Sequence, residues 1–264
     1  MKGLKGKTAI VTGGSRGIGK AIVEMLLEHH VSVLFTGRNE KTGEDTMREL
    51  KSRFDTPIAF FAGDMGEEQV CIDAADKALQ FLGRVDYLVN NAFPFTAKYL
   101  DASRKDWLHI MEAGPIAYAA MITQYVRVHG ALNPGAIVNV SSISQYIAQP
   151  RRWTYNAAKG AVGQLTRCAA MDLAPYIRVN SVSPATVWTD ECKGIREHDD
   201  QLFRDTHMID RVIEAEEVAP PILFLLSEYA SAITATDLRV DGGYLSMGPT
   251  GWGYDEEHPN KGSN

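Results

Sequence analysis

The sequence predicts an α/β fold, a doubly wound parallel sheet of about seven strands with helices on both faces. Three observations support this. The chain opens with a short apolar run, a cluster of glycines and an amphipathic stretch, in KTAIVTGGSRGIGKAIVEMLLEHH. Further apolar runs alternate with helical stretches, as in a parallel sheet covered on both sides. The 264 residues, 45% of them hydrophobic, suit one domain with a substantial core.

Seven short apolar runs predict the strands, and the segments between them have helical spacing. The runs lie at about 7–12, 31–36, 57–62, 85–90, 135–141, 177–182 and 236–241. We expect a single nucleotide-binding domain over residues 1–264. Within it we expect a core over 5–245, a substrate lid over about 187–211 and a C-terminal tail over 246–264, and the tail could reach across an oligomer interface.

The glycines after the first strand predict a turn that approaches a phosphate group. Gly13, Gly14, Gly17 and Gly19 stand between a strand and a helix. Glycine lets the backbone come close to a pyrophosphate, and the unpaired N–H groups of the helix start attract the same anion. A tight strand-to-helix turn also needs glycine for its backbone angles alone, so this pattern by itself leaves both interpretations open.

Ser142, Tyr155 and Lys159 predict a proton-transfer site. Tyr155 and Lys159 are four residues apart, so on a helix they share one face. A phenol titrates near ~10, and a cation within roughly 4–6 Å lowers its pKa. Tyr155 would then exchange a proton with a carbonyl or alcohol oxygen that Ser142 holds. The alternative is an aromatic anchor beside a solvated lysine, since Tyr-x-x-x-Lys occurs by chance on many helices.

Several motifs together resemble the short-chain dehydrogenase/reductase family, single-domain type, over about residues 5–245. They are Thr12-Gly13-x-x-x-Gly17-Ile18-Gly19, Asn90-Asn91-Ala92, Ser142, Tyr155-x-x-x-Lys159, Arg178-Val179-Asn180-x-x-x-Pro184 and Val240-Asp241-Gly242-Gly243. The resemblance implies a Rossmann-like domain, a nicotinamide cofactor and hydride exchange with an alcohol or carbonyl. By the same resemblance, Tyr155 is the general acid/base, Lys159 also binds the nicotinamide ribose, and Ser142 orients the substrate. Asn90 would support the cofactor side.

The end of the second predicted strand favours NADP(H), with NAD(H) possible. Gly37 stands where we expect a carboxylate for a free ribose 2′-hydroxyl, and Arg38 and Arg16 can converge on a 2′-phosphate. Alternatively, Arg38 is only a solvated loop residue. Asp64 resembles the family's adenine-contacting acid, and its rival role is that of a loop cap. The expected cofactor site comprises Gly13, Ser15, Arg16, Gly17, Ile18, Gly19, Arg38, Asp64, Met65, Asn91, Ala92, Tyr155, Lys159, Pro184, Val187 and Thr189.

The sequence departs from the family pattern at three positions. Phe93 follows Asn90-Asn91-Ala92 where the family usually has glycine, so a large ring should either narrow the substrate pocket or pack under the loop. Gly114 stands where the family has an asparagine that holds a relay water, and Gly114-Pro115 should interrupt the helix. Ala185 replaces a common glycine. These changes keep a nucleotide-binding regulatory or scaffold role open.

The substrate is expected to be small and polar, a sugar, polyol or cyclic ketone. Donor-rich side chains between Ser144 and Trp153 suit a polyhydroxylated or anionic molecule. Trp188 would anchor the lid or pack structurally. The residues expected at the substrate are Phe93, Ser144, Gln149 and Trp188. A 3-oxoacyl thioester reductase is an alternative, and elimination or epimerisation would need an activating group that the sequence does not offer.

Charge and composition set the remaining expectations. The net charge of -6 argues against a nucleic-acid partner, and no run of roughly 20 apolar residues predicts a membrane span. The three cysteines lie far apart, so we expect neither disulfides nor zinc, and His198, Asp199, Asp200 and His207 fit a solvated loop better than a metal site. The N-terminus leaves no room for a signal peptide, so we expect a cytoplasmic protein. From the resemblance we expect a homo-oligomer, a tetramer or dimer.

Overall fold

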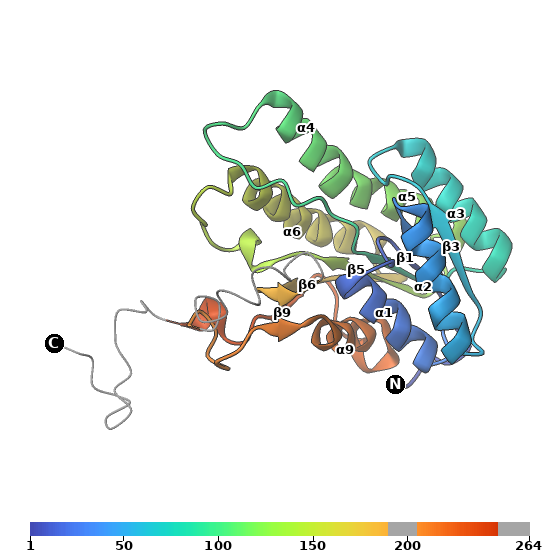
Figure 1. Ribbon diagram of the computed structural model, residues 1–264. Coiled ribbons are helices and arrows are strands. Elements are labelled where there is room, and N and C mark those ends of the chain that lie inside the picture. The colour runs from blue at the N-terminus through green and yellow to red at the C-terminus, as the bar shows by residue number, and fades with distance from the viewer. Residues whose placement is uncertain (190–204, 248–264) are drawn as a thin grey trace, which may run out of the picture.

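The fold is a seven-stranded parallel sheet between two layers of helices (Figure 1), as the computed structural model shows. The structure describes residues 1–189 and 205–247. Each predicted strand is confirmed: β1 Thr8–Val11, β2 Ser32–Gly37, β3 Ile58–Ala62, β4 Tyr87–Asn90, β5 Gly135–Val140, β6 Ile177–Pro184 and β9 Asp237–Val240. The strand order is β3-β2-β1-β4-β5-β6-β9, and every neighbouring pair is parallel.

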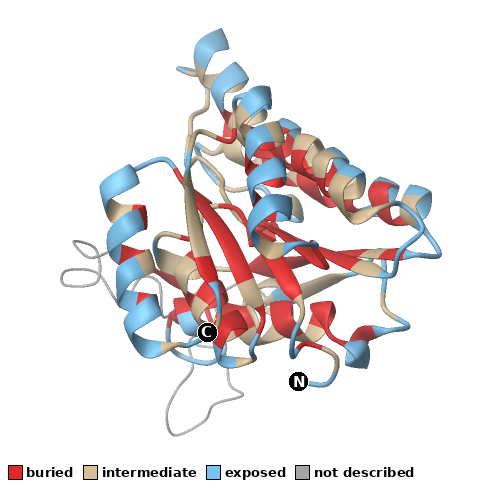
Figure 2. Cartoon of the chain, turned by 90° about the vertical axis from the view of Figure 1, so that its right-hand side faces the viewer, coloured by how far each residue is buried: buried red, intermediate tan, exposed pale blue. Residues whose placement is uncertain are grey.

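Helices connect the strands and cover both faces of the sheet. They are α1 Gly17–Glu28, α2 Glu40–Arg53, α3 Glu68–Leu82, α4 Arg104–Met111, α5 Ala117–His129, α6 Trp153–Leu173 and α9 Ala215–Leu226, with short helical turns at Ile143–Gln145, Glu228–Ala230 and Tyr244–Ser246. In Figure 1, α1 and α9 lie side by side below the sheet, and α5 and α6 lie above it. Figure 2 shows buried strands in the centre and exposed outer faces on the helices.

Alternation along the strands builds one core on each face of the sheet. In β1, Ala9 and Val11 join the core under α1 and α9, while Ile10 joins the core under α3 and α5. Successive strand residues point to opposite faces, and all three side chains are completely buried. The near-continuous apolar character of the predicted strands therefore reflects burial on both faces.

The sheet order places the carboxyl ends of β1 and β4 at a topological switch point. The chain leaves β1 toward β2 and β3, and then crosses back to β4 on the other side of β1. Open α/β sheets bind ligands at such a point, outside the carboxyl ends of the strands. Both the glycine turn after β1 and the Asn90-Asn91-Ala92 segment at the end of β4 lie there.

The predicted helix interruption at Gly114-Pro115 is confirmed. Glu112–Ile116 form a short π-helical segment between α4 and α5, and Gly114 has a non-helical conformation, with φ -110 and ψ -109. Pro115 has no N–H to donate to the preceding turn, which explains the break. The interruption lies beside the predicted catalytic residues and shapes their surroundings.

A short parallel pair, β7 Val187–Trp188 with β8 Ile213–Glu214, was not predicted. It brings the two described ends of the predicted 187–211 lid together, whereas the middle of the lid and most of the 246–264 tail lie outside the described residues. His198, Asp199 and Asp200 lie outside them as well. His207 is buried and contacts the ring of Tyr244.

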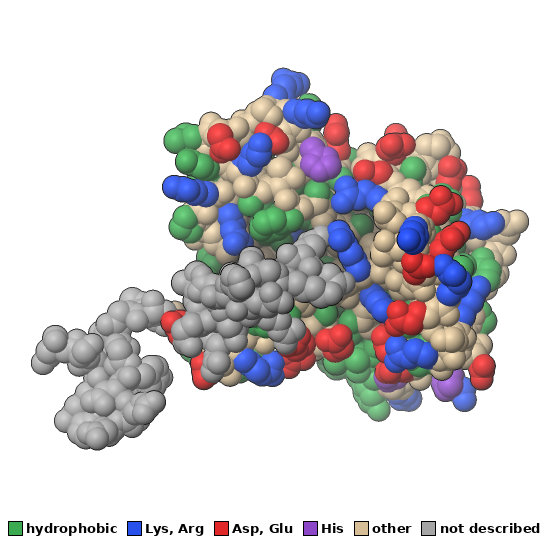
Figure 3. Space-filling model, in the orientation of Figure 1, with side chains coloured by type: hydrophobic (Ala, Val, Ile, Leu, Met, Phe, Trp, Pro, Cys, Tyr) green, Lys and Arg blue, Asp and Glu red, His purple; other side chains and the backbone are tan. Residues whose placement is uncertain are grey.

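No helix within residues 1–189 and 205–247 is long and apolar enough to cross a membrane. The same residues contain no cluster of three or more His, Cys, Asp or Glu side chains that could hold a metal ion. Acidic and basic side chains are interspersed over the face that Figure 3 shows.

Candidate active site

The turn between β1 and α1 forms a backbone cradle that glycine makes possible. Gly13 and Gly17 have φ of 70 and 52, in the left-handed region that other residues avoid. A Cβ on Gly19 would lie 2.0 Å from the carbonyl oxygen of Gly13, so the helix start and the strand end touch. This close approach of the helix start to the strand end is the geometry that a pyrophosphate site at a helix N-terminus uses.

Asn91 holds this cradle from the neighbouring strand. Its side-chain amide donates hydrogen bonds to the carbonyl oxygens of Thr12 and Gly13, both at 3.0 Å. The Thr12 hydroxyl accepts from the backbone N–H groups of Asn91 and Ala92, at 2.9 and 3.0 Å. Asn90, expected to support the cofactor side, is buried, and its amide donates to the Asn139 side-chain oxygen at 3.0 Å and to the Tyr118 carbonyl of α5 at 3.3 Å.

We expect Gly19→Ala to weaken nucleotide binding by about 5–150-fold, because an added methyl group must displace the Gly13 backbone at a cost of roughly 1–3 kcal/mol. The measurement is the dissociation constant from quenching of protein fluorescence by the nucleotide. Gly160→Ala is the matched control, since a Cβ there meets no atom within 4 Å. Equal affinities in the two variants would contradict the cradle.

The other predicted cofactor residues gather around this turn to differing extents. A Cβ on Gly17 would lie 3.3 Å from Thr189, so Thr189 borders the cradle. Met65 is buried, and its sulfur accepts a hydrogen bond from Thr36. The Asp64 carboxylate accepts from the Gly66 N–H at 3.0 Å, so the loop role is realised, although Glu67 is the cap of α3. Pro184 ends β6, and Val187 is buried in β7.

The positions that bear on cofactor choice follow the adjacent strands β1 and β2. Gly37 ends β2, and a Cβ on it would lie 2.8 Å from the Ser15 hydroxyl, so a larger side chain would crowd the turn. Arg38 follows directly and is exposed, and Arg16 is exposed at the start of α1. The carboxyl ends of two neighbouring parallel strands thus carry both guanidinium groups.

Ser142, Tyr155 and Lys159 are brought together by β5, the short turn that follows it, and α6. Ser142 lies two residues after β5 and caps Ile143–Gln145, accepting from the Ser144 N–H at 3.2 Å. Tyr155 and Lys159 lie on one face of α6, as their spacing predicts. The Lys159 ammonium is buried and donates to the Val140 carbonyl oxygen at 3.0 Å.

The pKa of the Tyr155 phenol does not follow the expected lowering by Lys159. Burial raises it to about 12, and hydrogen bonding to Ser142 and the positive charge of Arg152 act in the opposite direction. Burial also lowers the pKa of Lys159 to about 7, because desolvation disfavours the ammonium. Lys159 is therefore close to losing its proton at neutral pH. For the Tyr155 phenol, the rise in pKa caused by desolvation is larger than any lowering by the lysine charge.

Aromatic rings surround the phenol. Phe93 and Phe95 contact the Tyr155 ring, with centroid separations of 5.8 and 5.1 Å. Phe93 also packs edge-on against Tyr118, whose hydroxyl donates to the same Val140 carbonyl as Lys159, at 3.1 Å. The sequence reasoning missed Tyr118, although it follows Gly114 by four residues and so lies close to the expected relay position.

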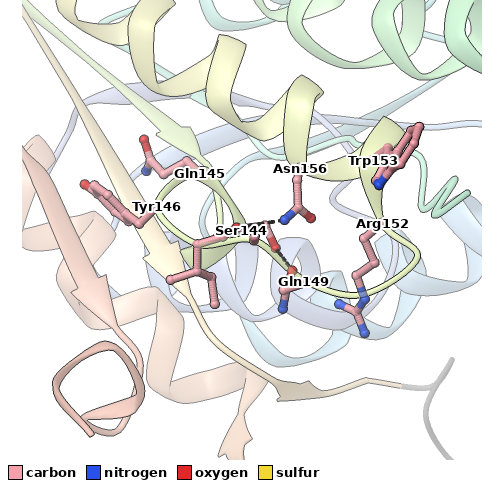
Figure 4. A pocket seen from close by; sticks show the side chains of 9 residues that line it. Ser144, Gln145, Tyr146, Gln149, Arg152, Trp153 and Asn156 are labelled. Atoms are coloured by element: carbon pink, nitrogen blue, oxygen red, sulfur yellow. Dashed lines mark hydrogen bonds between the residues drawn. The ribbon is translucent and has the colours of Figure 1, made fainter. Parts of the chain in front are cut away.

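A pocket of about 410 Å³ opens beside the predicted catalytic residues. Figure 4 shows that its lining comes from the 144–152 loop and the start of α6. The Ser142 hydroxyl donates to Ser144 at 3.1 Å, and Ser144 donates to the side-chain oxygen of Gln149 at 2.6 Å. These hydroxyls connect the surroundings of Tyr155 with the pocket. The residues that line the pocket are Ser144, Gln145, Tyr146, Ile147, Ala148, Gln149, Arg152, Trp153 and Asn156.

Two residues expected at the substrate do not line this pocket. Phe93 packs beneath Tyr155, which favours the packing alternative. Trp188 is 7% exposed in the β7–β8 pair, so its side chain packs inside the protein. Ser144 and Gln149 do line the pocket. Asn156 joins them, with its amide donating to the Ile147 carbonyl at 2.8 Å.

A Rossmann-type sheet with a glycine cradle and a Tyr–Lys pair on one helix face defines a nucleotide-binding oxidoreductase. The family profile described as Enoyl-(Acyl carrier protein) reductase matches residues 13–245. The chain belongs to the short-chain dehydrogenase/reductase family, as the resemblance indicated, and this family binds nicotinamide cofactors.

Similar proteins of this family are named for several substrates. L-xylulose reductase of Mus musculus is 34% identical over 92% of this chain and 98% of its own. The 3-oxoacyl-[acyl-carrier-protein] reductase FabG of Chlamydia muridarum is 31% identical over 91% of this chain and 98% of its own. The crystal structure of L-sorbose reductase from Gluconobacter frateurii, complexed with NADPH and L-sorbose, has a TM-score of 0.87 and 26% identity, covering 92% and 98% of the two chains.

Proposed function

We propose that this protein exchanges hydride between NADP(H) and a hydroxyl or carbonyl group of a small polar substrate, with Tyr155 as the general acid/base. The observation that carries the proposal is the meeting of Ser142, Tyr155 and Lys159 next to the glycine cradle, at the switch point of the sheet. The cradle fits a dinucleotide, because its glycines let the end of β1 and the start of α1 approach each other closely: a Cβ on Gly19 would lie 2.0 Å from the Gly13 carbonyl oxygen.

In reduction, a bound nicotinamide would supply the hydride that the substrate carbonyl carbon receives. Tyr155 donates its phenolic proton to the carbonyl oxygen, which becomes the hydroxyl of the product. Ser142 donates a hydrogen bond to the same oxygen and fixes its position. The ammonium of Lys159 stabilises the phenolate that Tyr155 becomes, and oxidation reverses these steps.

Polarity around the pocket supports a sugar, polyol or polar cyclic ketone as the substrate. Ser144, Gln149 and Asn156 offer hydrogen-bonding groups, and Figure 4 shows Gln149 and Arg152 extending from one loop. Within the described part of the chain, no carboxylate pairs with Arg152, which leaves this cation for a hydroxyl-rich or anionic ligand. Two of the similar proteins are named for L-xylulose and L-sorbose, which supports the sugar class.

A 3-oxoacyl thioester reductase is the second candidate, because the Chlamydia muridarum relative carries that name. A spectrophotometric screen with both cofactors, against ketoses, polyols, cyclic ketones and 3-oxoacyl thioesters, decides between them. We expect NADPH-dependent turnover of a ketose or cyclic ketone. Turnover of the thioester alone would favour the second candidate, and no turnover of any substrate would contradict both.

We expect Arg38→Leu to lower kcat/KM for NADPH by about 10–100-fold, since a charge-assisted hydrogen bond to a phosphate contributes roughly 1.5–3 kcal/mol. The value for NADH should hardly change, because NADH has no 2′-phosphate. Arg127→Leu is the matched control, since Arg127 is an arginine near the end of α5, at the opposite edge of the sheet. A loss shared equally by both cofactors would contradict 2′-phosphate recognition.

A further inference from the structure

The ammonium of Lys159 lies on the face of the Phe93 ring. Its nitrogen is 3.5 Å from the ring centroid, closer than its 5.7 Å to the centroid of Tyr155. Phe93 is held in place by edge-on contacts with Tyr118 on α5 and Tyr155 on α6. A buried cation this close to a ring that two other aromatic rings hold in place is in the arrangement that gives a cation–π interaction.

Gly114 provides the space for this ring. A Cβ on Gly114 would lie 2.9 Å from both Cε2 and Cζ of Phe93. Any side chain at position 114 would therefore start inside the volume that the ring occupies. The two departures from the family pattern are thus a single structural feature, in which an aromatic ring fills the place of the expected relay side chain.

The ring bears on the charge state of Lys159 because few other groups stabilise that charge. Lys159 is 3% exposed, and its ammonium has one hydrogen-bond acceptor among the described residues, the Val140 carbonyl. The titratable groups that face it are Tyr155 on its own helix and Tyr118 on α5, and both phenols have raised pKa values through burial. Desolvation is the cause that lowers the pKa of Lys159. The negative face of the ring opposes this lowering.

We propose that Phe93 is a positioning residue that holds Lys159 in place as an ammonium through a cation–π contact, and that Gly114 is required for that contact. The ring replaces the polar relay on this side of the site. The contribution of Lys159 to turnover rests on the proposed function, whereas the contact itself and its effect on the lysine charge do not.

The first test replaces Phe93 with phenylalanine analogues bearing one, two and three ring fluorines, which keep the ring shape but weaken its negative face. The readout is the free energy of unfolding between pH 5 and 11, relative to Lys159→Met, because that difference isolates the lysine titration. Plotted against pH, this difference bends at the pKa that Lys159 has in the folded protein. We expect that bend to move to lower pH with each fluorine, by about 0.5–1 pH unit over the series. An unmoved bend would overturn the proposal, and this readout needs no catalytic activity.

The second test uses kinetics and a double-mutant cycle. Phe93→Leu retains an apolar side chain but removes the ring, and should lower kcat about 3–10-fold at neutral pH, with recovery at lower pH and an unchanged substrate KM. Gly114→Ala should impair the native enzyme but add little to Phe93→Leu, since the clash partner is gone. Additive losses that are equal at every pH would indicate packing alone and contradict the proposal. If the wild-type protein turns over no substrate, the proposed function fails, while the unfolding test still decides the contact.

Discussion

Replacing Tyr155 with phenylalanine is expected to lower kcat by about 10²–10⁴-fold, the usual contribution of a general acid/base. The change removes only the hydroxyl, so the ring contacts with Phe93 and Phe95 remain. Nucleotide affinity should stay close to that of the wild type, because Gly13 to Gly19 and Asn91 are untouched. The measurements are single-turnover reduction with the substrate from the screen, and nucleotide binding by fluorescence.

Tyr229→Phe is the matched control, since Tyr229 is 64% exposed and remote in sequence from the site. It should leave turnover and stability unchanged. Undiminished turnover in Tyr155→Phe would show that the phenol is not the acid/base. Loss of nucleotide binding in the same variant would instead point to a collapsed site.

The Lys159→Met variant is expected to lose about 10²–10³-fold in kcat, because it removes the charge that stabilises the phenolate. At the same time we expect it to unfold less readily than the wild type at pH 7, by about 1–4 kcal/mol, since methionine fills a similar volume without a buried charge. The measurements are kcat and chemical denaturation. A variant that is both inactive and strongly destabilised would contradict the expectation that the buried Lys159 ammonium lowers the free energy of unfolding.

The pH dependence of this difference follows from the lysine pKa. The folded value is about 7 and the ordinary value is 10.5, so between these pH values the unfolded chain holds one proton more than the folded chain. The stability of the wild type therefore rises with pH across that window, and below it the full cost of burying the ammonium is present. The advantage of Lys159→Met should be largest below pH 7 and shrink toward pH 10.5. A difference that is constant with pH would mean that the buried lysine does not titrate as proposed.

Most of the sheet could be predicted from the sequence, because the inner strands β2, β1, β4, β5 and β6 are short runs that are buried almost throughout. The helix break at Gly114-Pro115 was predictable for a similar local reason, since proline lacks the N–H that a helix needs. The β7–β8 pair was not, because two residues on each side carry no periodicity and pair only through tertiary packing. Trp188 could have faced a ligand or the interior, and burial in that pair decided it.

The sequence by itself determined the class of this protein, since the glycine turn and the order Ser142, Tyr155, Lys159 are local patterns whose spacing encodes their geometry. It also showed that Phe93 and Gly114 are unusual, but it treated them as two separate changes. Only the tertiary structure joined them, because the chain between them folds back so that the Phe93 ring contacts both the glycine and the Lys159 ammonium. The charge balance of the site was decided there too: burial raises the pKa of Tyr155 and lowers that of Lys159. Desolvation depends on everything packed around a group, and a spacing of four residues does not contain that information.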